Sequence, residues 1–305
     1  MNILVTGATG LVGTALVSRL KGSGHSVVPL RRTAVSSGSG PTWNPESGQV
    51  HLDAAGSLDA VVHLAGENIA QRWTPAAKAR IRASRVDATR LLSEALARAP
   101  QPPRALVCAS ATGVYGDRGA EVLDEHSDPG TGFLAEVCQA WEAATAPARD
   151  RGIRVVHLRL GIVLARQGGA LARMLPLFRL GLGGRLGSGR QYWSWITLED
   201  LVRVVELALL DGGLSGAVNA VAPEAATNAG FTAALARALH RPAFLPVPAL
   251  FVRAVLGEMG REALLASARV RPARLLEAGF SFRFPDLDAA FGHVLASDNP
   301  NRGDR

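Results

Sequence analysis

The sequence is poor in cysteine, lysine and tyrosine, and it contains no long apolar run. Its two cysteines, Cys108 and Cys138, do not belong to any metal-ligand cluster, so no metal site is expected. A membrane-spanning helix is not expected, because no run of about 18 apolar residues is present. The N-terminus also lacks the pattern of a signal peptide. We therefore expect a cytoplasmic protein in a reducing environment.

The charge balance is basic, with a formal net charge of +7 over 305 residues. The basic residues are almost all arginines, and no basic run has aromatic residues interleaved with it, which disfavours nucleic acid as a partner. Solvated helix faces and a phosphate-bearing small molecule explain the charge more simply. We expect a small-molecule substrate, neither nucleic acid nor membrane as a partner, and a monomer or homodimer.

The N-terminal segment is an apolar strand pattern that runs directly into a glycine-rich turn and an apolar-faced helical stretch. Such glycines let the backbone approach a pyrophosphate, whose charge the N–H groups of the helix start then bind. An ordinary tight turn between strand and helix is the alternative. The residues expected to bind the cofactor here are Gly7, Thr9, Gly10, Leu11, Val12 and Gly13.

Short apolar runs alternate with helical patterns through the first half of the chain. Strands are expected at 3–5, 26–30, 60–64, 105–109, 154–158 and 217–221, and helices at 11–21, 75–99, 133–149 and 198–210. This alternation predicts an α/β fold with a doubly wound parallel sheet, the Rossmann architecture. Residues 33–58 are rich in Ser, Gly and Pro and are interpreted as an irregular connection.

Two units are expected along the chain. Residues 1–164 form the dinucleotide-binding domain, to which 196–222 return, whereas 165–195 and 223–296 form a small α+β substrate lobe. The stretch 165–195 is interpreted as loop-dominated, and its Arg185 and Arg190 are candidates for holding a substrate phosphate, with solvated arginines as the alternative. The polar tail 297–305 is expected to be disordered.

The end of the second strand indicates which cofactor is bound. An acidic residue there would bond the adenosine ribose, whereas arginine suits a 2′-phosphate. The chain has Arg31 and Arg32 at this point and no acid before Glu46. Because arginine forks match phosphate in charge and geometry, the sequence favours NADP(H) over NAD(H).

Several motifs together resemble the extended short-chain dehydrogenase/reductase superfamily. They are Thr6–Gly13, His63-Leu64-Ala65-Gly66 and the run from Ser110 to Gly116. More narrowly the chain is similar to an atypical, NAD-dependent epimerase/dehydratase-like branch with a small C-terminal domain of unassigned function, through motifs at 65–68, 133–142, 187–189, 194–196, 219–223 and 226–228. The resemblance implies an NADP-binding protein of the nucleoside-diphosphate-sugar epimerase type, but no particular substrate.

The acid–base pair of that superfamily is missing. Its chemistry uses a tyrosine whose pKa is lowered by a lysine four residues on. The only tyrosines and lysines are Tyr115, Tyr192, Lys21 and Lys78, so no such pair exists. By the resemblance, the tyrosine and lysine positions fall near Leu134 and Cys138, the serine position at Ala111 and the supporting asparagine near Arg85.

Other polar groups near the expected cofactor are candidates to replace this pair. Glu67 follows the strand that ends at the cofactor and can act as a base if burial raises its pKa; a capping or loop acid is the alternative. The catalytic candidates are Glu67, Arg85, Ser110, Thr112 and Tyr115. A solvated arginine is the alternative for Arg85, and a partly buried packing role is favoured for Tyr115. Further cofactor contacts are expected from Leu64, Ala65, Gly66, Glu67, Arg85, Ala109, Gly161 and Val163.

Two functions are compatible with these observations. The first is an NADP(H)-dependent oxidoreductase or epimerase that acts on a small carbonyl or nucleotide-sugar-like substrate through non-standard residues. The second is a non-catalytic NADP(H)-binding sensor or regulator. The polar groups after residues 66 and 109 converge on one site, which favours the enzyme.

Overall fold

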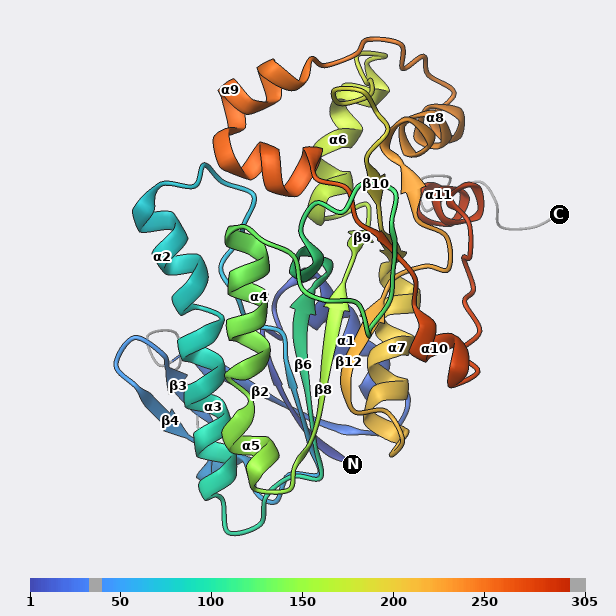
Figure 1. Ribbon diagram of the computed structural model, residues 1–305. Coiled ribbons are helices and arrows are strands. Elements are labelled where there is room, and N and C mark those ends of the chain that lie inside the picture. Colours follow the sequence, from blue (N-terminus) through green and yellow to red (C-terminus); the bar gives the residue numbers. More distant parts are fainter. Residues whose placement is uncertain (33–39, 297–305) are drawn as a thin grey trace, which may run out of the picture.

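The computed structural model describes residues 1–32 and 40–296, and the tail at 297–305 lies outside them. Within these residues an eight-stranded sheet runs in the order β12-β8-β6-β5-β1-β2-β3-β4, parallel except for the β3–β4 pair (Figure 1). Its strands are β1 (Asn2–Thr6), β2 (Ser26–Arg32), β3 (Thr42–Asn44), β4 (Gln49–His51), β5 (Ala60–His63), β6 (Ala105–Ala111), β8 (Arg154–Leu160) and β12 (Gly216–Ala220). The expected doubly wound parallel sheet is confirmed.

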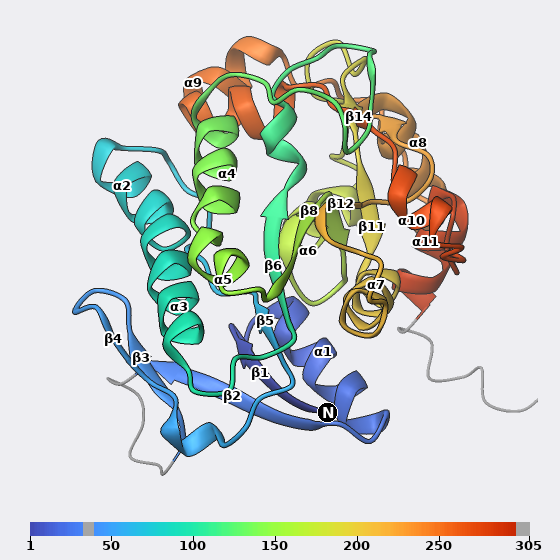
Figure 2. The same ribbon diagram turned by 60° about the horizontal axis from the view of Figure 1, so that its bottom comes forward.

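Helices cover both faces of this sheet. Helices α1 (Leu11–Gly22) and α7 (Leu198–Leu210) lie on one face, and α3 (Val86–Arg98), α4 (Phe133–Ala143) and α5 (Ala146–Asp150) lie on the other (Figure 2). Side chains of β1 alternate between the two apolar layers, with Ile3 and Val5 facing α1 and Leu4 facing α3. All three are fully buried, which explains the unbroken apolar sequence of this strand.

Both long helices expected in the first half are interrupted. The predicted helix 75–99 is divided into α2 (Pro75–Ala83) and α3, because the Ser84 hydroxyl donates to the carbonyl of Ile81 (3.0 Å). The predicted helix 133–149 is divided into α4 and α5. There the Thr145 hydroxyl bonds the carbonyl of Glu142 (2.7 Å), and Pro147 lacks the N–H that a continuous helix would use.

Two segments expected to be irregular contain regular structure. Residues 42–51 form the β3–β4 hairpin, which extends the sheet and buries Trp43. Residues 33–39, the first part of the expected connection, lie outside the described residues. The glycine-rich stretch contains helix α6 (Gly169–Arg179), whose Leu171, Leu175 and Phe178 are buried at helical spacing. This spacing of apolar residues predicts a helix, but the high glycine and arginine content of the stretch led to its interpretation as a loop.

The remaining elements lie outside the main sheet. Besides α6, they are β7 (Val122–Leu123), β9 (Ile162–Leu164), β10 (Tyr192–Trp193), β11 (Trp195–Thr197), β13 (Ala226–Thr227), α8 (Asn228–Leu239), α9 (Ala249–Met259), β14 (Arg269–Val270), α10 (Ala273–Glu277) and α11 (Leu287–Ala296). Several of them, including α6, α8 and α11, pack around a separate apolar cluster. Phe231 is at the centre of this cluster, with edge-on ring contacts to Trp193 (5.2 Å) and Phe291 (5.1 Å). Among the described helices, none has the length and apolar character needed to cross a membrane.

Candidate functional site: the glycine turn and the carboxyl edge of the sheet

The turn between β1 and α1 accepts only glycine at two positions. Gly7 has φ +67°, and a Cβ there would lie 2.9 Å from the carbonyl carbon of Leu64. A Cβ on Gly13 would lie 2.1 Å from the carbonyl oxygen of Gly7. Helix α1 then starts with Gly10 as its N-cap, with no capping side chain and no acidic residue in its first turn. Its first N–H groups and dipole are therefore available to an anion.

A buried polar chain holds the neighbouring strand beside this turn. The Thr6 hydroxyl accepts hydrogen bonds from the N–H groups of Leu64 (3.1 Å) and Ala65 (3.2 Å), so its proton is directed to Nδ1 of His63 at 2.7 Å. Nε2 of His63 therefore carries the ring proton and donates to Oγ1 of Thr89 (2.9 Å). Burial lowers the pKa of His63 to about 4, so the ring is neutral near pH 7.

Arg85 lies over the backbone of Gly66, directly after β5. A Cβ on Gly66 would be 3.4 Å from the guanidinium carbon of Arg85, which also stacks 5.2 Å from the Trp141 ring. The guanidinium donates to the carbonyl of Ile81 (3.3 Å), and no carboxylate among the described residues forms an ion pair with it. Burial lowers the pKa of Arg85. It is thus a half-buried cation with most of its donors unused.

Glu67 follows Gly66 and stays partly accessible. Its carboxylate accepts from Nε2 of Gln71 (3.3 Å) and lies 3.5 Å from Nε of Arg80, while its side chain is 35% exposed. The N–H of Glu67 donates to the Ser84 hydroxyl (2.9 Å), the group that also interrupts the α2–α3 helix. The break in that helix therefore positions both Glu67 and Arg85.

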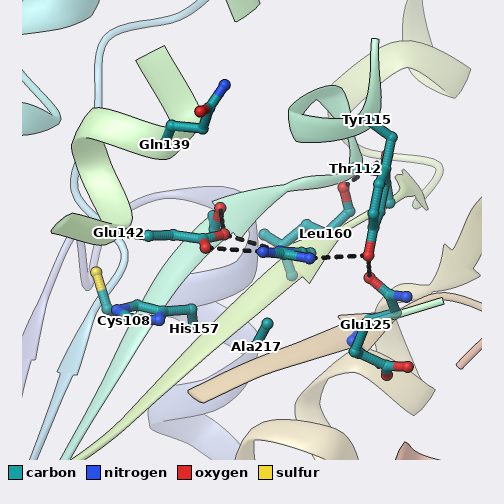
Figure 3. Close-up of polar contacts among 12 residues, drawn as sticks. Cys108, Thr112, Tyr115, Glu125, Gln139, Glu142, His157, Leu160 and Ala217 are labelled. Carbon is teal, nitrogen blue, oxygen red and sulfur yellow. Dashed lines mark hydrogen bonds and ion pairs between the residues drawn. The ribbon is translucent and has the colours of Figure 1, made fainter. Parts of the chain in front are cut away.

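Ser110 and Tyr115 belong to a buried ionic network rather than to an open surface. Figure 3 shows Tyr115 and Glu142 in this network, with dashed lines for its hydrogen bonds. The Ser110 hydroxyl donates to Glu142 (2.7 Å), whose two carboxylate oxygens accept a bidentate pair of bonds from Arg159 (2.9 and 3.0 Å). Arg159 also donates to the Tyr115 hydroxyl (3.0 Å), which donates to Oδ1 of Asn219 (2.8 Å). Both hydroxyls of the candidate residues are therefore engaged within the protein.

The charges in this network are coupled. Burial alone would raise the pKa of Glu142, but the hydrogen bonds and charge of Arg159 outweigh it, and the pKa of Glu142 is lowered. Burial raises the pKa of Tyr115 despite the nearby Arg159. One face of α4 carries Leu134, Cys138 and Glu142 at four-residue spacing. This spacing could have indicated from the sequence that Glu142 faces the sheet edge.

The other predicted contacts lie along the same edge. Thr112 donates to the carbonyl of Leu160 (3.3 Å), and Ala109 is buried within β6. A Cβ on Gly161 would lie 2.6 Å from the carbonyl oxygen of Ser194, so strand packing alone requires glycine there. Val163 follows on β9, in register with Ile196 of β11.

The adenosine end of the expected cofactor is marked by Arg31 and Arg32, which are exposed at the end of β2. Of the turn residues, Thr9 and Gly10 are exposed, whereas Val12 packs partly against the core. The side chain of Leu11 contacts the backbone at Gly168, where a Cβ would lie 3.0 Å from Leu11 Cδ1.

Sequence reasoning did not find a carboxylate that reaches α4 from the C-terminal part of the chain. Oε2 of Glu262 accepts from the N–H of Leu134 (3.1 Å), and its carboxylate lies 3.1 Å from where a Cβ on Gly132 would be. Nearby, Lys78 on α2 forms a salt bridge with Glu258 (2.9 Å). These partners are more than a hundred residues apart in sequence, and no local pattern connects them.

Comparisons with known proteins agree with this geometry. The model of the NAD dependent epimerase/dehydratase family matches residues 3–220, and a domain of unknown function, DUF1731, matches residues 247–294. The chain belongs to the NAD-dependent epimerase/dehydratase family. An epimerase family protein of Mycobacterium bovis is 46% identical over 293 residues, covering 96% of this chain and 97% of that protein. The expected resemblance, including the small C-terminal domain of unassigned function, is confirmed.

Two solved structures of similar proteins extend the comparison. The crystal structure of the human epimerase family protein SDR39U1 with NADPH is 38% identical, with a TM-score of 0.89, and covers 97% of this chain and 99% of that chain. The nucleoside-diphosphate sugar epimerase of Corynebacterium glutamicum is also 38% identical, with a TM-score of 0.78, over 97% of this chain and 58% of that chain. The expectation of NADP(H) agrees with the ligand of the human protein.

Proposed function

We propose that this member of the epimerase family binds NADP(H) and acts as an oxidoreductase or epimerase on a small carbonyl or nucleotide-sugar-like substrate. The observation that carries the proposal is the glycine turn, where Gly7 and Gly13 leave no room for a Cβ and α1 begins without a side-chain cap. This arrangement suits a pyrophosphate. The NADPH in the human relative supports the choice of cofactor.

The residues along the sheet edge fit a dinucleotide laid across it. Arg31 and Arg32 would hold the 2′-phosphate, the turn would hold the pyrophosphate, and Leu64 to Gly66 would line its path towards the β6 end. When bound, the nicotinamide supplies hydride transfer. Arg85 would donate to ligand oxygens over Gly66, because most of its donors have no protein partner.

The accessible polar groups would then carry out the acid–base catalysis. Glu67 would serve as the base and Arg85 would orient the substrate, since both border Gly66 and neither is enclosed in the Glu142–Arg159 network. Ser110 and Tyr115 would act through that network by fixing the sheet edge, and Thr112 would line the nicotinamide side. These roles replace the absent tyrosine–lysine pair.

A binding-only protein that senses NADP(H) is the second candidate. The observation that favours it is that the hydroxyls of Ser110 and Tyr115 are already bonded to Glu142, Arg159 and Asn219. Leu134 and Cys138 stand where the superfamily has its reactive pair, and burial raises the pKa of Cys138 to about 12, so its thiol stays neutral.

Stopped-flow absorbance at the NADPH band separates the two candidates. The enzyme hypothesis predicts oxidation of protein-bound NADPH by at least one member of a panel of carbonyl compounds and nucleotide sugars. It also predicts that the Glu67→Gln variant still binds NADPH but loses this oxidation. Tight NADPH binding with no oxidation across the panel supports the sensor instead.

A further inference from the structure

A groove on the C-terminal part of the chain shares no residue with the candidate site at the glycine turn and the carboxyl edge of the sheet. It lies between α8, the loop that follows this helix and the glycine-rich loop at Arg185, and its volume is about 930 Å³. Its lining residues are Arg185, Ala229, Thr232, Ala233, Ala236, Arg237, His240, Arg241, Pro242, Ala243, Phe244 and Pro246. Arg185 is the one lining residue that the sequence analysis singled out, as a candidate for holding a substrate phosphate, and none of the roles under the proposed function uses this groove.

The floor of the groove is apolar. Ala229, Ala233 and Ala236 follow one another along one side of α8, where only methyl groups cover the helix backbone. Phe244 also lines the groove, with 74% of its surface exposed, which is unusual for so large an apolar side chain. A flat or aliphatic group placed on the alanines would contact this ring and remove both surfaces from water.

The rim of the groove is cationic, and part of its charge has no protein partner. Arg237 is paired with Asp288 (2.7 Å). Among the described residues, no carboxylate pairs with Arg185 or Arg241, and His240 adjoins the second of these. The Arg185 side chain is held in place against the backbone, because a Cβ on Gly189 would lie 3.2 Å from its Cδ.

The two chain segments that line the groove carry charge of one sign only, and Asp288 of α11 is the acid that adjoins its rim through Arg237. Residues 165–195 contain five arginines and no aspartate or glutamate, and residues 225–257 contain three arginines, one histidine and no acid. A second copy of this chain would bring the same positive surface to the groove and be repelled. An inorganic anion would leave the alanine floor and Phe244 uncovered. Charge and shape together therefore select a small organic anion.

We propose that this groove is a second ligand site, for a small molecule in which a phosphate or carboxylate carries an apolar or aromatic group. Arg185 and Arg241 hold the anion, and the α8 alanines and Phe244 cover the apolar group. The proposal goes beyond the NADP(H) function, because a site of this kind would bind a substrate portion or an effector away from the glycine turn. Laurate and uridine monophosphate represent its aliphatic and aromatic forms.

Isothermal titration calorimetry with laurate, uridine monophosphate and inorganic phosphate tests the proposal, with and without NADPH. We expect at least one organic probe to bind, inorganic phosphate to bind more weakly, and affinity to fall about tenfold or more in Arg185→Gln/Arg241→Gln. Ala233→Leu, which fills the floor, should weaken the organic probe but leave NADPH binding unchanged. Arg253→Gln, an exposed arginine outside the groove, is the matched control.

Three results would overturn the proposal. They are no organic probe binding below about 1 mM, equal loss of affinity in Arg253→Gln and the double variant, or inorganic phosphate binding as tightly as the organic probes. Failure of NADPH to bind would contradict the proposed function but not this site, since the two share no residues.

Discussion

The hydroxyl of Thr6 donates its proton to Nδ1 of His63 across 2.7 Å, joining the last residues of two paired strands, β1 and β5. The other ring nitrogen donates to Thr89, which also accepts from the indole N–H of Trp141 (2.9 Å). The chain of bonds therefore runs from the strand before the glycine turn to helix α4. It fixes the edge on which Gly66 and Arg85 lie, and it requires a neutral histidine.

This requirement makes stability depend on pH. The pKa of His63 is about 4 in the fold and about 6.5 when the chain is unfolded. Between these values the unfolded state binds more protons, so the free energy of unfolding falls as the pH drops from 6.5 to 4, by about 3 kcal/mol from this group. Urea denaturation at pH 7, 6 and 5 measures the slope.

His63→Asn should flatten that slope, although it will not abolish it, because burial also lowers the pKa of His157. The variant keeps an acceptor near Nδ1 but has no titrating ring. An unchanged slope in His63→Asn would show that the buried ring does not carry the effect.

Removing the charge of only one partner of the Glu142–Arg159 pair should lower the free energy of unfolding strongly. Glu142→Gln leaves the guanidinium of Arg159 nearly buried without its counter-ion, and we expect the free energy of unfolding to fall by about 3 kcal/mol or more. Glu142→Leu/Arg159→Met removes both charges and should cost less than Glu142→Gln alone. Urea denaturation compares them; a loss in the double variant as large as that in Glu142→Gln would contradict the coupling.

Much of the fold follows from local pattern, and the places where prediction failed have physical causes. The unbroken apolar run of β1 and the glycine spacing after it are local features of adjacent residues, so the sheet and its turn were predictable. The helix breaks at Ser84 and Thr145 depend on side-chain bonds to the backbone that helical periodicity does not show. The hairpin at 42–51 is short and polar apart from Trp43, Pro45 and Val50, too few apolar residues to show a strand pattern.

The candidate site was predictable in part, for a similar reason. Residues at strand ends, such as Gly66, meet at one edge because the strands are parallel. Contacts between distant segments, such as Glu262 with the N–H of Leu134, arise from tertiary packing and leave no local pattern. The engagement of Ser110 and Tyr115 likewise depends on Arg159 and Asn219, from strands far along the chain.

Gly13→Ala should impair NADPH binding. The added methyl group would meet the carbonyl oxygen of Gly7 at 2.1 Å, so the turn must open and its N–H groups must move. We expect affinity to fall about tenfold or more, measured by NADPH fluorescence. Gly22→Ala, at the other end of α1 with nothing within 4 Å of its Cβ, is the control and should bind normally. Equal binding by both variants would remove the turn from the site.

Arg85→Met should separate binding from stability. It removes a half-buried cation that has no ion-pair partner among the described residues, so the melting temperature should stay unchanged or rise. Affinity for NADPH or substrate should fall, because unused donors over Gly66 are lost. Thermal melts and titrations on one preparation test this. A lower melting temperature with unchanged ligand affinity would assign Arg85 a structural role.

The claim that the glycine turn and the sheet edge bind NADP(H) rests on Arg31 and Arg32 acting together with the turn. Titration of NADPH and NADH into the native chain and into Arg31→Ala/Arg32→Ala tests it most directly, with the distant Arg98→Ala as the matched control. We expect native binding to favour NADPH and the double variant to lose about tenfold or more in NADPH affinity, while NADH binding stays the same. Unchanged NADPH affinity in the double variant, or equal loss in Arg98→Ala, would contradict the account.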